Sequence, residues 1–569
     1  MSRRFCLALC AAGGLLSACG GGRTPPPPRP HVVLISVDSL RADHLGCYGY
    51  SRSTSPTIDR LAAEGALFEV VTSSSSWTLP AHAALFTALP DSAHGVDRGS
   101  RKLEAERRTL AEALRAAGYR TAGVWSGPLL DPRFGFGQGF DAYVSHAETE
   151  EDWDRAVERS HQAVTGPSIL ARVEELLEPG GPGPLFLFVH LWDVHYDYIP
   201  PAPYDTLFAA DYSGEVDGRD LVDYLRLGLE DLSQADLRRL TALYDGEIAW
   251  TDRQIGTILE MLEQRGLADD TLVVVTSDHG EELFEHGSFG HKRKLFDESI
   301  RIPLVVGYPD RIAAGLRIAQ PAAIVDVAPT ILELAGAEPL PDVLGRSLVP
   351  LLEGGSSLPP APVVAELVDD PRTGELLLAV RSPEWKILVR PKSGRTIGLW
   401  DLEADPFEQT NVFRVDPELT ASAVAGLRSA LAELEHLRDR HAHASSTEAA
   451  ESLPADLLRE MESLGYLDLA VPQEAEGPLR ASPNPIRVCD GTGIGVTTLV
   501  WDVADAGGLL EIRVDGPHGK LFARTAASGS AATGPWARDG MVFVLVAADT
   551  GEVLGSTIVR VTRAGCQAD

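Results

Sequence analysis

Apolar runs rich in β-branched residues alternate with segments of helical periodicity between residues 31 and 350. The predicted strands are His31 to Val37, Thr121 to Trp125, Leu185 to Val189, Thr271 to Thr276 and Ile302 to Val306. The predicted helices are Pro56 to Glu64, Ala81 to Leu89, Leu103 to Ala117, Leu237 to Leu267 and Asp326 to Leu334. Continuous apolar strands are typical of a sheet that is buried on both faces. Their alternation with helices predicts an α/β fold with a mostly parallel sheet flanked by helices.

The pattern changes twice after residue 350. Short β segments up to Leu402 and a helix from Glu418 to Ala442 predict a small antiparallel subdomain over 351–470, which also holds a partly helical stretch, Leu457 to Leu464. Residues 471–485 are predicted to be a linker. Residues 486–569 consist of short β runs separated by glycines, which predicts a β-sandwich domain. Its predicted strands are Thr497 to Val503, Leu509 to Val514, Met541 to Val546 and Thr557 to Val561.

The N-terminus begins with Arg3 and Arg4, followed by an apolar run from Phe5 to Leu16 and the sequence Leu-Ser-Ala-Cys that ends at Cys19. This segment resembles a bacterial lipoprotein signal, which implies that 1–18 are removed and that Cys19 is acylated. Residues 19–30 contain four consecutive prolines and read as a tether. We therefore expect a lipid-anchored protein of the bacterial cell envelope, exposed to the periplasm or the exterior. An uncleaved anchor or a plain secretory signal is the alternative.

The formal net charge of -32 argues against nucleic acid as a partner, because an acidic surface repels phosphate backbones. The same negative charge repels anionic lipid headgroups, so the lipid anchor is the only predicted membrane contact. Of the six cysteines, Cys489 and Cys566 flank the last domain and are candidates for a disulfide in an oxidising compartment. Cys47 is predicted to be a small buried hydrophobe.

Polar residues follow three of the predicted strands, where sites form in open α/β sheets. They are Asp38, then His190 with His195, and Asp278 with His279. Thr78 follows a serine run and precedes Pro80, so its hydroxyl is predicted at the start of a helix. Each residue alone has a common structural explanation as a cap, a hydrogen-bonded histidine or a turn. Together they are oxygen and imidazole ligands suited to a divalent cation beside a hydroxyl nucleophile.

Several long motifs resemble the sulfatase family of the alkaline phosphatase superfamily. They are VLISVDSLRADHLGCYGYSRSTSPTIDRLAAEGALF, SWTLPAHAALFTAL, YDGEIAWTDRQIG, SDHGEELFEHGSFGHKRKLFDESIRIPLVV and LWDLEADPFEQTNV, which together lie within residues 31–468. The resemblance implies the alkaline-phosphatase-like fold. It also implies a divalent metal, with calcium, zinc and manganese as the candidates, and a small anionic ester as the substrate.

The same resemblance implies roles for individual residues. Asp38, Asp278 and His279 match metal-ligand positions, and Thr78 matches the nucleophile. His195 matches a histidine that contacts the substrate and assists the leaving group. Lys292 matches a lysine that binds the oxygens of the sulfuryl group. Arg41 is suited to an anion contact, although a solvated surface arginine is the favoured interpretation.

Four departures from the family pattern argue against an ordinary sulfatase. Thr78 stands where the family has Cys or Ser, and threonine cannot become formylglycine. The arginine of that motif is missing, since His82 occupies its place. Ser39 replaces a second carboxylate, and the lysine expected near Trp125 is absent. The departures resemble the threonine-nucleophile relatives, which are phosphodiesterases, phosphonate monoester hydrolases and headgroup phosphotransferases.

In the phosphoethanolamine transferases, the positions of His195 and His291 bind a second zinc. A second metal or substrate contact at His195 and His291, with His190 and Ser39 nearby, is therefore a hypothesis, and a single-metal site is the alternative. We expect a metal-dependent hydrolase of sulfate or phosphate esters, with phosphodiesters and phosphonate esters favoured chemically. A phosphoethanolamine-type headgroup phosphotransferase and a non-catalytic envelope binding protein are the alternatives.

Overall fold

The central sheet of the protein has eight strands in the order β12-β2-β11-β7-β1-β6-β4-β5. The structure is a computed structural model that describes residues 29–99, 101–146, 164–178, 183–209, 211–219, 221, 232–309, 311–355, 357–359, 361, 363–370, 375–441, 479–482, 486–488, 494–503, 509–514, 519–533, 537–538, 541–548, 553–559 and 561–562. The predictions for Cys19, for Leu457 to Leu464, and for Cys489 and Cys566 fall outside these residues. Among the described residues, no helix has both the length and the apolar character needed to cross a bilayer.

Five consecutive parallel strands form the part of this sheet that runs from β7 to the edge strand β5. They are β1 (His31–Val37), β4 (Arg120–Trp125), β5 (Ala142–Ser145), β6 (Leu185–Leu191) and β7 (Thr271–Ser277). β1 pairs in parallel with both β6 and β7, and β4 pairs in parallel with both β6 and β5. Every residue of β6 and β7 is buried, as the unbroken apolar runs predict. The predicted mostly parallel sheet is confirmed.

The other side of β7 departs from the parallel pattern. β11 (Leu304–Gly307) is antiparallel to β7 and to β2 (Ala66–Phe68), and β12 (Leu316–Ile318) lies at the edge beside β2. The predicted strand Ile302 to Val306 is wrong in its extent. The chain instead splits at Pro303, because proline cannot donate a ladder hydrogen bond. The preceding residues form β10 (Arg301–Ile302), which pairs with β3 (Val71–Thr72) in a separate sheet.

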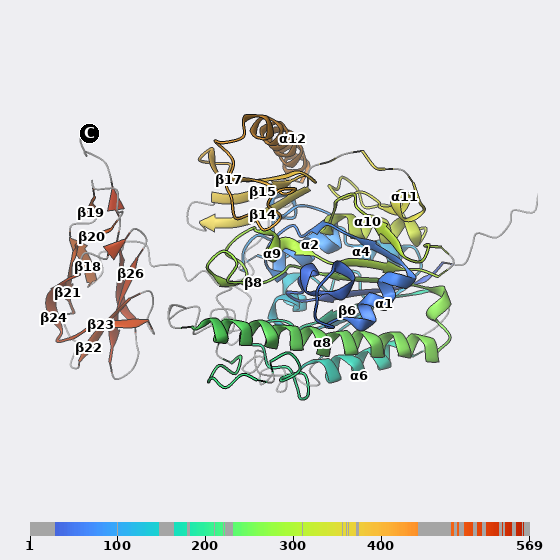
Figure 1. Ribbon diagram of the computed structural model, residues 1–569, viewed down its shortest axis with the longest axis horizontal. Helices are drawn as coiled ribbons and strands as arrows, with labels where there is room; N and C mark the ends of the chain where they lie inside the picture. The colour runs from blue at the N-terminus through green and yellow to red at the C-terminus, as the bar shows by residue number, and fades with distance from the viewer. Residues whose placement is uncertain are drawn as a thin grey trace, which may run out of the picture.

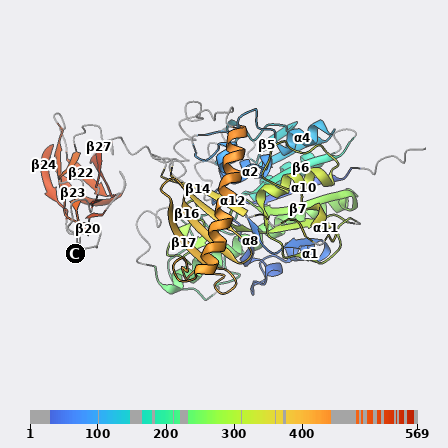
Figure 2. The ribbon, with the colours of Figure 1, turned by 90° about the horizontal axis from the view of Figure 1, so that it is seen from above.

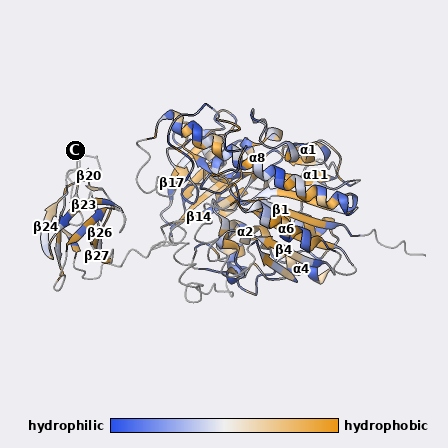
Figure 3. Cartoon of the chain, turned by 90° about the horizontal axis from the view of Figure 1, so that it is seen from below, coloured by the Kyte–Doolittle hydropathy of each residue, from blue (hydrophilic) through white to orange (hydrophobic). Residues whose placement is uncertain are grey.

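Helices cover both faces of the sheet (Figure 1). One face carries α1 (Pro56–Glu64), α6 (Gly166–Leu177) and the long α8 (Gln234–Gln264), and the other carries α2 (Thr78–Thr87), α4 (Leu110–Ala116) and α10 (Val327–Leu334). Figure 3 shows apolar residues along β1 and β4, whereas α8 is apolar on one side and polar on the other. The predicted helix Leu103 to Ala117 begins later than expected, at a capping box between Thr109 and Glu112.

The C-terminal subdomain is an antiparallel sheet covered by one helix (Figure 2). Its strands are β14 (Val363–Asp370), β15 (Glu375–Arg381), β16 (Trp385–Arg390) and β17 (Arg395–Asp401), and the helix is α12 (Pro417–His441). Ile387 of the sheet and Leu434 of the helix belong to a core that these elements share. Backbone hydrogen bonds attach β14 to the first domain, since the Glu366 amide donates to the Ser74 carbonyl over 2.7 Å.

Residues beyond 478 form antiparallel strands with a hydrophobic core of their own. One sheet has the order β23-β22-β26-β27 and the other β18-β21-β24. The strands are β18 (Leu479–Ser482), β21 (Thr498–Asp502), β22 (Leu510–Val514), β23 (Lys520–Thr525), β24 (Ser528–Ala532), β26 (Val542–Ala547) and β27 (Val553–Ile558). Trp501 of the three-stranded sheet and Phe543 of the four-stranded sheet share one cluster of buried side chains. This arrangement agrees with the β-sandwich that the alternating pattern predicts.

Candidate active site

Three of the predicted site residues meet at the carboxyl edge of the central sheet. Asp38 directly follows β1, and Asp278 and His279 directly follow β7. Val37 pairs with Ser277, so the two neighbouring strands end at the same level. The sheet register therefore brings the two carboxylates and the imidazole together, which is what parallel strands do with residues that follow them.

Thr78 is the first residue of α2 and points its hydroxyl at this cluster. Its Oγ1 lies 3.3 Å from Asp38 Oδ2 and 3.3 Å from His279 Nε2. The N-cap is Trp77, so Thr78 is inside the helix and its side chain is available for chemistry. All four side chains are completely buried. The structure thus assembles Thr78, Asp38, Asp278 and His279 around one point.

The ligand atoms of Asp38, Asp278 and His279 form a group in which every pair lies within 4.8 Å. His279 Nε2 is 3.7 Å from Asp38 Oδ1 and 3.5 Å from Asp278 Oδ2. Asp278 Oδ2 is buried without a hydrogen bond, which is costly for a carboxylate unless a cation is bound. The residues present therefore fit a divalent metal ion.

His82 is a member of the site that the sequence interpretation missed. It lies one turn after Thr78 on α2, and with His190 and Asp278 it forms a second group of ligand atoms within 4.8 Å of one another. Its Nδ1 is 3.0 Å from the Thr78 carbonyl and its Nε2 is 3.0 Å from Ser36 Oγ. The i, i+4 spacing from Thr78 was the signal that could have identified it.

His190 lies on the other side of Asp38. Its Nε2 is 3.5 Å from Asp38 Oδ2, and its Nδ1 is 3.0 Å from the Ser126 carbonyl. Ser39 contacts both acids, because its hydroxyl donates to Asp38 Oδ1 and its amide donates to Asp278 Oδ1. His190 and Ser39 therefore both contact the acids of this group, and their predicted role in a second metal or substrate contact stays a prediction.

The two acids have opposite pKa shifts although both are fully buried. Burial alone raises the pKa of Asp38, but the imidazoles of His190, His195 and His279 outweigh it and hold the pKa well below its usual range. Burial and the nearby charge of Asp38 raise the pKa of Asp278 to about 6. The cluster therefore keeps Asp38 ionised and makes Asp278 harder to ionise than an ordinary aspartate.

His195, His291 and Lys292 line the approach to these residues. The rings of His291 and His279 are 4.4 Å apart, and those of His195 and His291 are 5.0 Å apart. His195 stacks on Trp192 at 4.0 Å. The Lys292 ammonium lies 4.5 Å from the ring centre of Trp77, the residue before the nucleophile. Two ligand groups occur among the described residues, and neither includes His195 or His291, so a second metal there stays a prediction.

Arg41 corrects one expectation. The sequence favoured a solvated arginine, but the side chain is buried and its guanidinium pairs with Asp43 and Glu285. It also donates to the Glu281 carbonyl, within the turn that follows Asp278 and His279. Arg41 therefore connects the loop after β1 to the turn after β7 that carries Asp278 and His279. Cys47 is partly buried rather than fully buried, and its thiol is not in a disulfide.

Comparisons with known proteins agree with this geometry. The family model described as sulfatase matches residues 30–337, and the model of the N-sulphoglucosamine sulphohydrolase C-terminal region matches residues 284–436. The chain belongs to the sulfatase family. The first match covers the central sheet with Thr78, Asp38, Asp278 and His279. The second covers most of the antiparallel subdomain.

Individual relatives include sulfatases and a phosphonate ester hydrolase. N-acetylglucosamine-6-O-sulfatase of Bacteroides thetaiotaomicron is 24% identical over 478 residues, which are 70% of this chain and 85% of that protein. Choline-sulfatase of Rhizobium meliloti is 35% identical over 185 residues, 32% of this chain and 35% of that protein. The phosphonate monoester hydrolase of Agrobacterium radiobacter superposes with a TM-score of 0.60 at 26% identity, covering 73% of this chain and 96% of that chain. The protein is accordingly a sulfuric or phosphoric ester hydrolase of this family.

Proposed function

We propose that this sulfatase-family hydrolase uses Thr78 as its nucleophile and cleaves phosphodiesters or phosphonate esters in preference to sulfate esters. The observation that carries the proposal is the position of Thr78 Oγ1, which is 3.3 Å from both Asp38 and His279 at a buried group of metal ligands. A divalent cation held by Asp38, Asp278 and His279 would lower the pKa of the threonine hydroxyl and neutralise charge on the ester oxygens.

The spacing of the ligand atoms favours zinc or a cation of similar size. Tetrahedral ligands at about 2.0–2.2 Å from a metal lie about 3.3–3.6 Å from one another. Thr78 Oγ1 is 3.3 Å from Asp38 Oδ2 and from His279 Nε2, and His279 Nε2 is 3.7 Å from Asp38 Oδ1 and 3.5 Å from Asp278 Oδ2. Calcium prefers six to eight oxygen ligands at about 2.3–2.6 Å, and one of these four donors is an imidazole nitrogen. We therefore propose zinc, with manganese as the next candidate.

The protein groups around Thr78 define the steps. The Thr78 hydroxyl gives up its proton to water, its oxygen attacks phosphorus in line with the ester bond, and the Lys292 ammonium compensates the charge of the non-bridging oxygens. The ester bond breaks and its electron pair leaves with the alkoxide, which takes a proton from His195. Water then attacks the threonine ester, and Thr78 is released with its hydroxyl restored. A formylglycine hydrate expels sulfate by collapsing to the aldehyde, and threonine cannot do this. A phosphothreonine is easier to hydrolyse than a threonine sulfate, so phosphorus esters are the favoured substrates.

The proposed function is tested by a parallel kinetic screen of the full chain. An aryl sulfate, a phosphate monoester, a phosphodiester and a phosphonate ester are compared after the metal is stripped by chelation and zinc, manganese or calcium is restored. We expect no turnover without metal, and the highest kcat/KM for the phosphodiester or phosphonate ester with zinc. Metal-independent turnover would contradict the proposal. Transfer of the group to an alcohol acceptor in place of water would indicate a phosphotransferase, and no turnover of any ester would indicate a binding protein.

Anchoring through Cys19 is a second proposal, supported by the lipoprotein-like pattern before this residue. It places the hydrolase in the bacterial cell envelope, where residues 19–30 would hold it off the membrane. A Cys19→Ala variant should appear in the soluble fraction and fail to incorporate labelled fatty acid. The same labelling of the unaltered chain and this variant would contradict the anchor.

A further inference from the structure

His82 joins the first turn of α2 to β1 through two hydrogen bonds. Its Nε2 lies 3.0 Å from Ser36 Oγ on β1, and its Nδ1 lies 3.0 Å from the Thr78 carbonyl. A second contact between the same two elements is the one between Thr78 Oγ1 and Asp38 Oδ2, at 3.3 Å. The helix that carries Thr78 is therefore attached to β1 and the residue after it at two points.

The spacings of a strand and a helix allow both attachments at once. Ser36 and Asp38 are two residues apart, so their side chains leave the same face of the strand about 6.6 Å apart. The strand geometry continues to Asp38, because its amide still donates to the Leu191 carbonyl of β6 over 2.9 Å. Thr78 and His82 are four residues apart on one side of a helix, where the rise is about 6 Å. The two separations match, so each strand residue meets one helix residue.

The partners of His82 determine where its proton lies. A carbonyl oxygen can only accept, so Nδ1 carries the hydrogen and donates it to Thr78. Nε2 is then the acceptor of the neutral imidazole, and the Ser36 hydroxyl donates to it. Asp278 Oδ2, at 3.6 Å from Nδ1, is too far away for a hydrogen bond. Both nitrogens are therefore used within the protein, and neither has a lone pair left for a metal ion.

The imidazole of His82 is enclosed by aromatic side chains. It is completely buried, and the rings of Phe86, Phe136 and Phe188 lie 6.5, 6.4 and 6.1 Å from it. A buried polar group requires its hydrogen-bond partners, because no water can replace them. Close packing on its apolar sides and two hydrogen bonds on its polar atoms fix the ring. A fixed donor holds the Thr78 carbonyl in one place.

We propose that His82 is a positioning residue for the nucleophile. Its imidazole holds the Thr78 carbonyl, and with it the first turn of α2, so that Thr78 Oγ1 lies 3.3 Å from both Asp38 and His279. Ser36 in turn orients the imidazole from β1. His82 acts through Thr78 and does not act on the substrate itself. The inference therefore rests on the proposed function and adds to it the group that aligns the attacking oxygen.

Steady-state kinetics of the metal-loaded full chain with an aryl phosphodiester test this role. His82→Leu removes both hydrogen bonds and keeps an apolar side chain among the aromatic rings. It should lower kcat about ten- to hundredfold, because a displacement of about 1 Å can cost about a hundredfold in rate. KM should change less than about threefold and the metal content should stay the same, since substrate and metal are held by other residues. His82→Asn should retain kcat within about fivefold, because its amide can donate from the place of Nδ1.

Phe86→Leu is the matched control, because Phe86 lies one turn further along α2 and belongs to the same aromatic surroundings. It should lower the melting temperature but change kcat less than about threefold, since a phenyl ring has no donor for the Thr78 carbonyl. Ser36→Ala removes only the bond to Nε2 and should lower kcat less than His82→Leu does. In the double variant of Ser36 and His82 the two losses should not add, because both residues act through the same hydrogen bonds.

The outcomes separate this inference from the proposed function. Turnover by Thr78→Ala would overturn both. If Thr78→Ala is inactive, a kcat of His82→Leu equal to that of Phe86→Leu would overturn the positioning role alone. Equal losses in His82→Leu and His82→Asn, or a loss of bound metal in both, would overturn it as well. Should His82→Leu fail to fold, Ser36→Ala decides: a lower kcat at unchanged KM supports the role, and an unchanged kcat contradicts it.

Discussion

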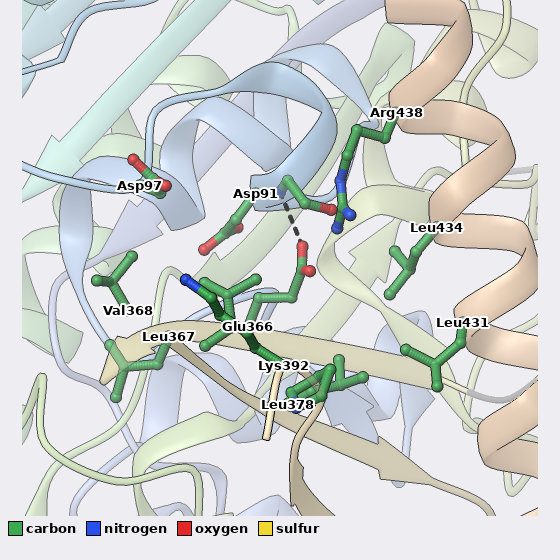
Figure 4. Close-up of a pocket in the computed structure, with 13 residues that line it drawn as sticks. Asp91, Asp97, Glu366, Leu367, Val368, Leu378, Lys392, Leu431, Leu434 and Arg438 are labelled. Carbon is green, nitrogen blue, oxygen red and sulfur yellow. Dashed lines mark hydrogen bonds between the residues drawn. The ribbon is translucent and has the colours of Figure 1, made fainter. Parts of the chain in front are cut away.

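Asp38 and Glu366 are both buried carboxylates, but their surroundings give them opposite properties. Three imidazoles surround Asp38 and hold its pKa well below the usual range, whereas a second acid faces Glu366 and its pKa rises to about 7. Burial opposes the charge at both positions. The comparison shows that burial does not determine the protonation of a carboxylate when strong partners are present. At the Thr78 site three imidazoles outweigh burial, whereas the Ser92 hydrogen bond and the charge of Arg438 lower the pKa of Glu366 less than burial and Asp91 raise it (Figure 4).

Removing the nucleophile should produce the largest effect. Thr78→Ala should lower kcat about a thousandfold or more and leave the metal content unchanged, since Asp38, Asp278 and His279 remain. Thr78→Ser keeps a hydroxyl and should retain much more activity. Thr87→Ala removes a threonine from the other end of the same buried helix and serves as the control. Steady-state kinetics and metal analysis check these expectations, and a Thr78→Ala rate equal to that of Thr87→Ala would contradict them.

A smaller loss is expected when positive charge is removed beside the nucleophile. Lys292→Ala should reduce kcat/KM about a hundredfold, because the ammonium next to Trp77 would no longer compensate the charge of the transferred group. Lys294→Ala is the matched control, since Lys294 pairs with Glu282 and the His286 carbonyl. We expect less than about a threefold change for the control. Equal losses in the two variants would exclude a specific role for Lys292.

The last prediction concerns stability rather than rate. Glu366 has a folded pKa of about 7 and a usual value of 4.5, so the folded state holds its proton more tightly than the unfolded state. The free energy of unfolding should therefore fall as the pH rises from about 4.5 to about 7, by at most about 3 kcal/mol for this group. Glu366→Gln should remove that part of the pH dependence. Thermal melts of both proteins across this range measure the difference, and parallel curves would show that Glu366 does not titrate there.

Much of the Thr78 site was predictable because it depends on strand order. Asp38 follows one continuous apolar strand, and Asp278 and His279 follow another. Because neighbouring parallel strands end at the same edge of the sheet, residues that follow them lie close together. His82 was missed because it was considered only as the position of an absent arginine, although its spacing from Thr78 on one helix placed it at the site. Arg41 was misjudged because its burial depends on Glu285, which the chain brings close only after folding.

The proximity of Asp91 and Glu366 could not be predicted from local pattern. Asp91 and Glu366 are far apart in the sequence, and each reads alone as an ordinary polar residue beside a turn or within a strand. Their proximity follows from the docking of β14 on the serine run before Thr78, which is a tertiary contact. The division of the predicted strand at Pro303 has a different cause, which is local, because proline cannot donate a ladder hydrogen bond.

The central claim is that Thr78 carries the transferred group. We would quench the metal-loaded chain with acid during turnover of an aryl phosphodiester and locate the modified peptide by mass spectrometry. The geometry predicts a phosphoester on Thr78, and its absence in the Thr78→Ala variant. Continued turnover by Thr78→Ala, or a modification on another residue that the variant retains, would contradict the assignment of Thr78 as the nucleophile.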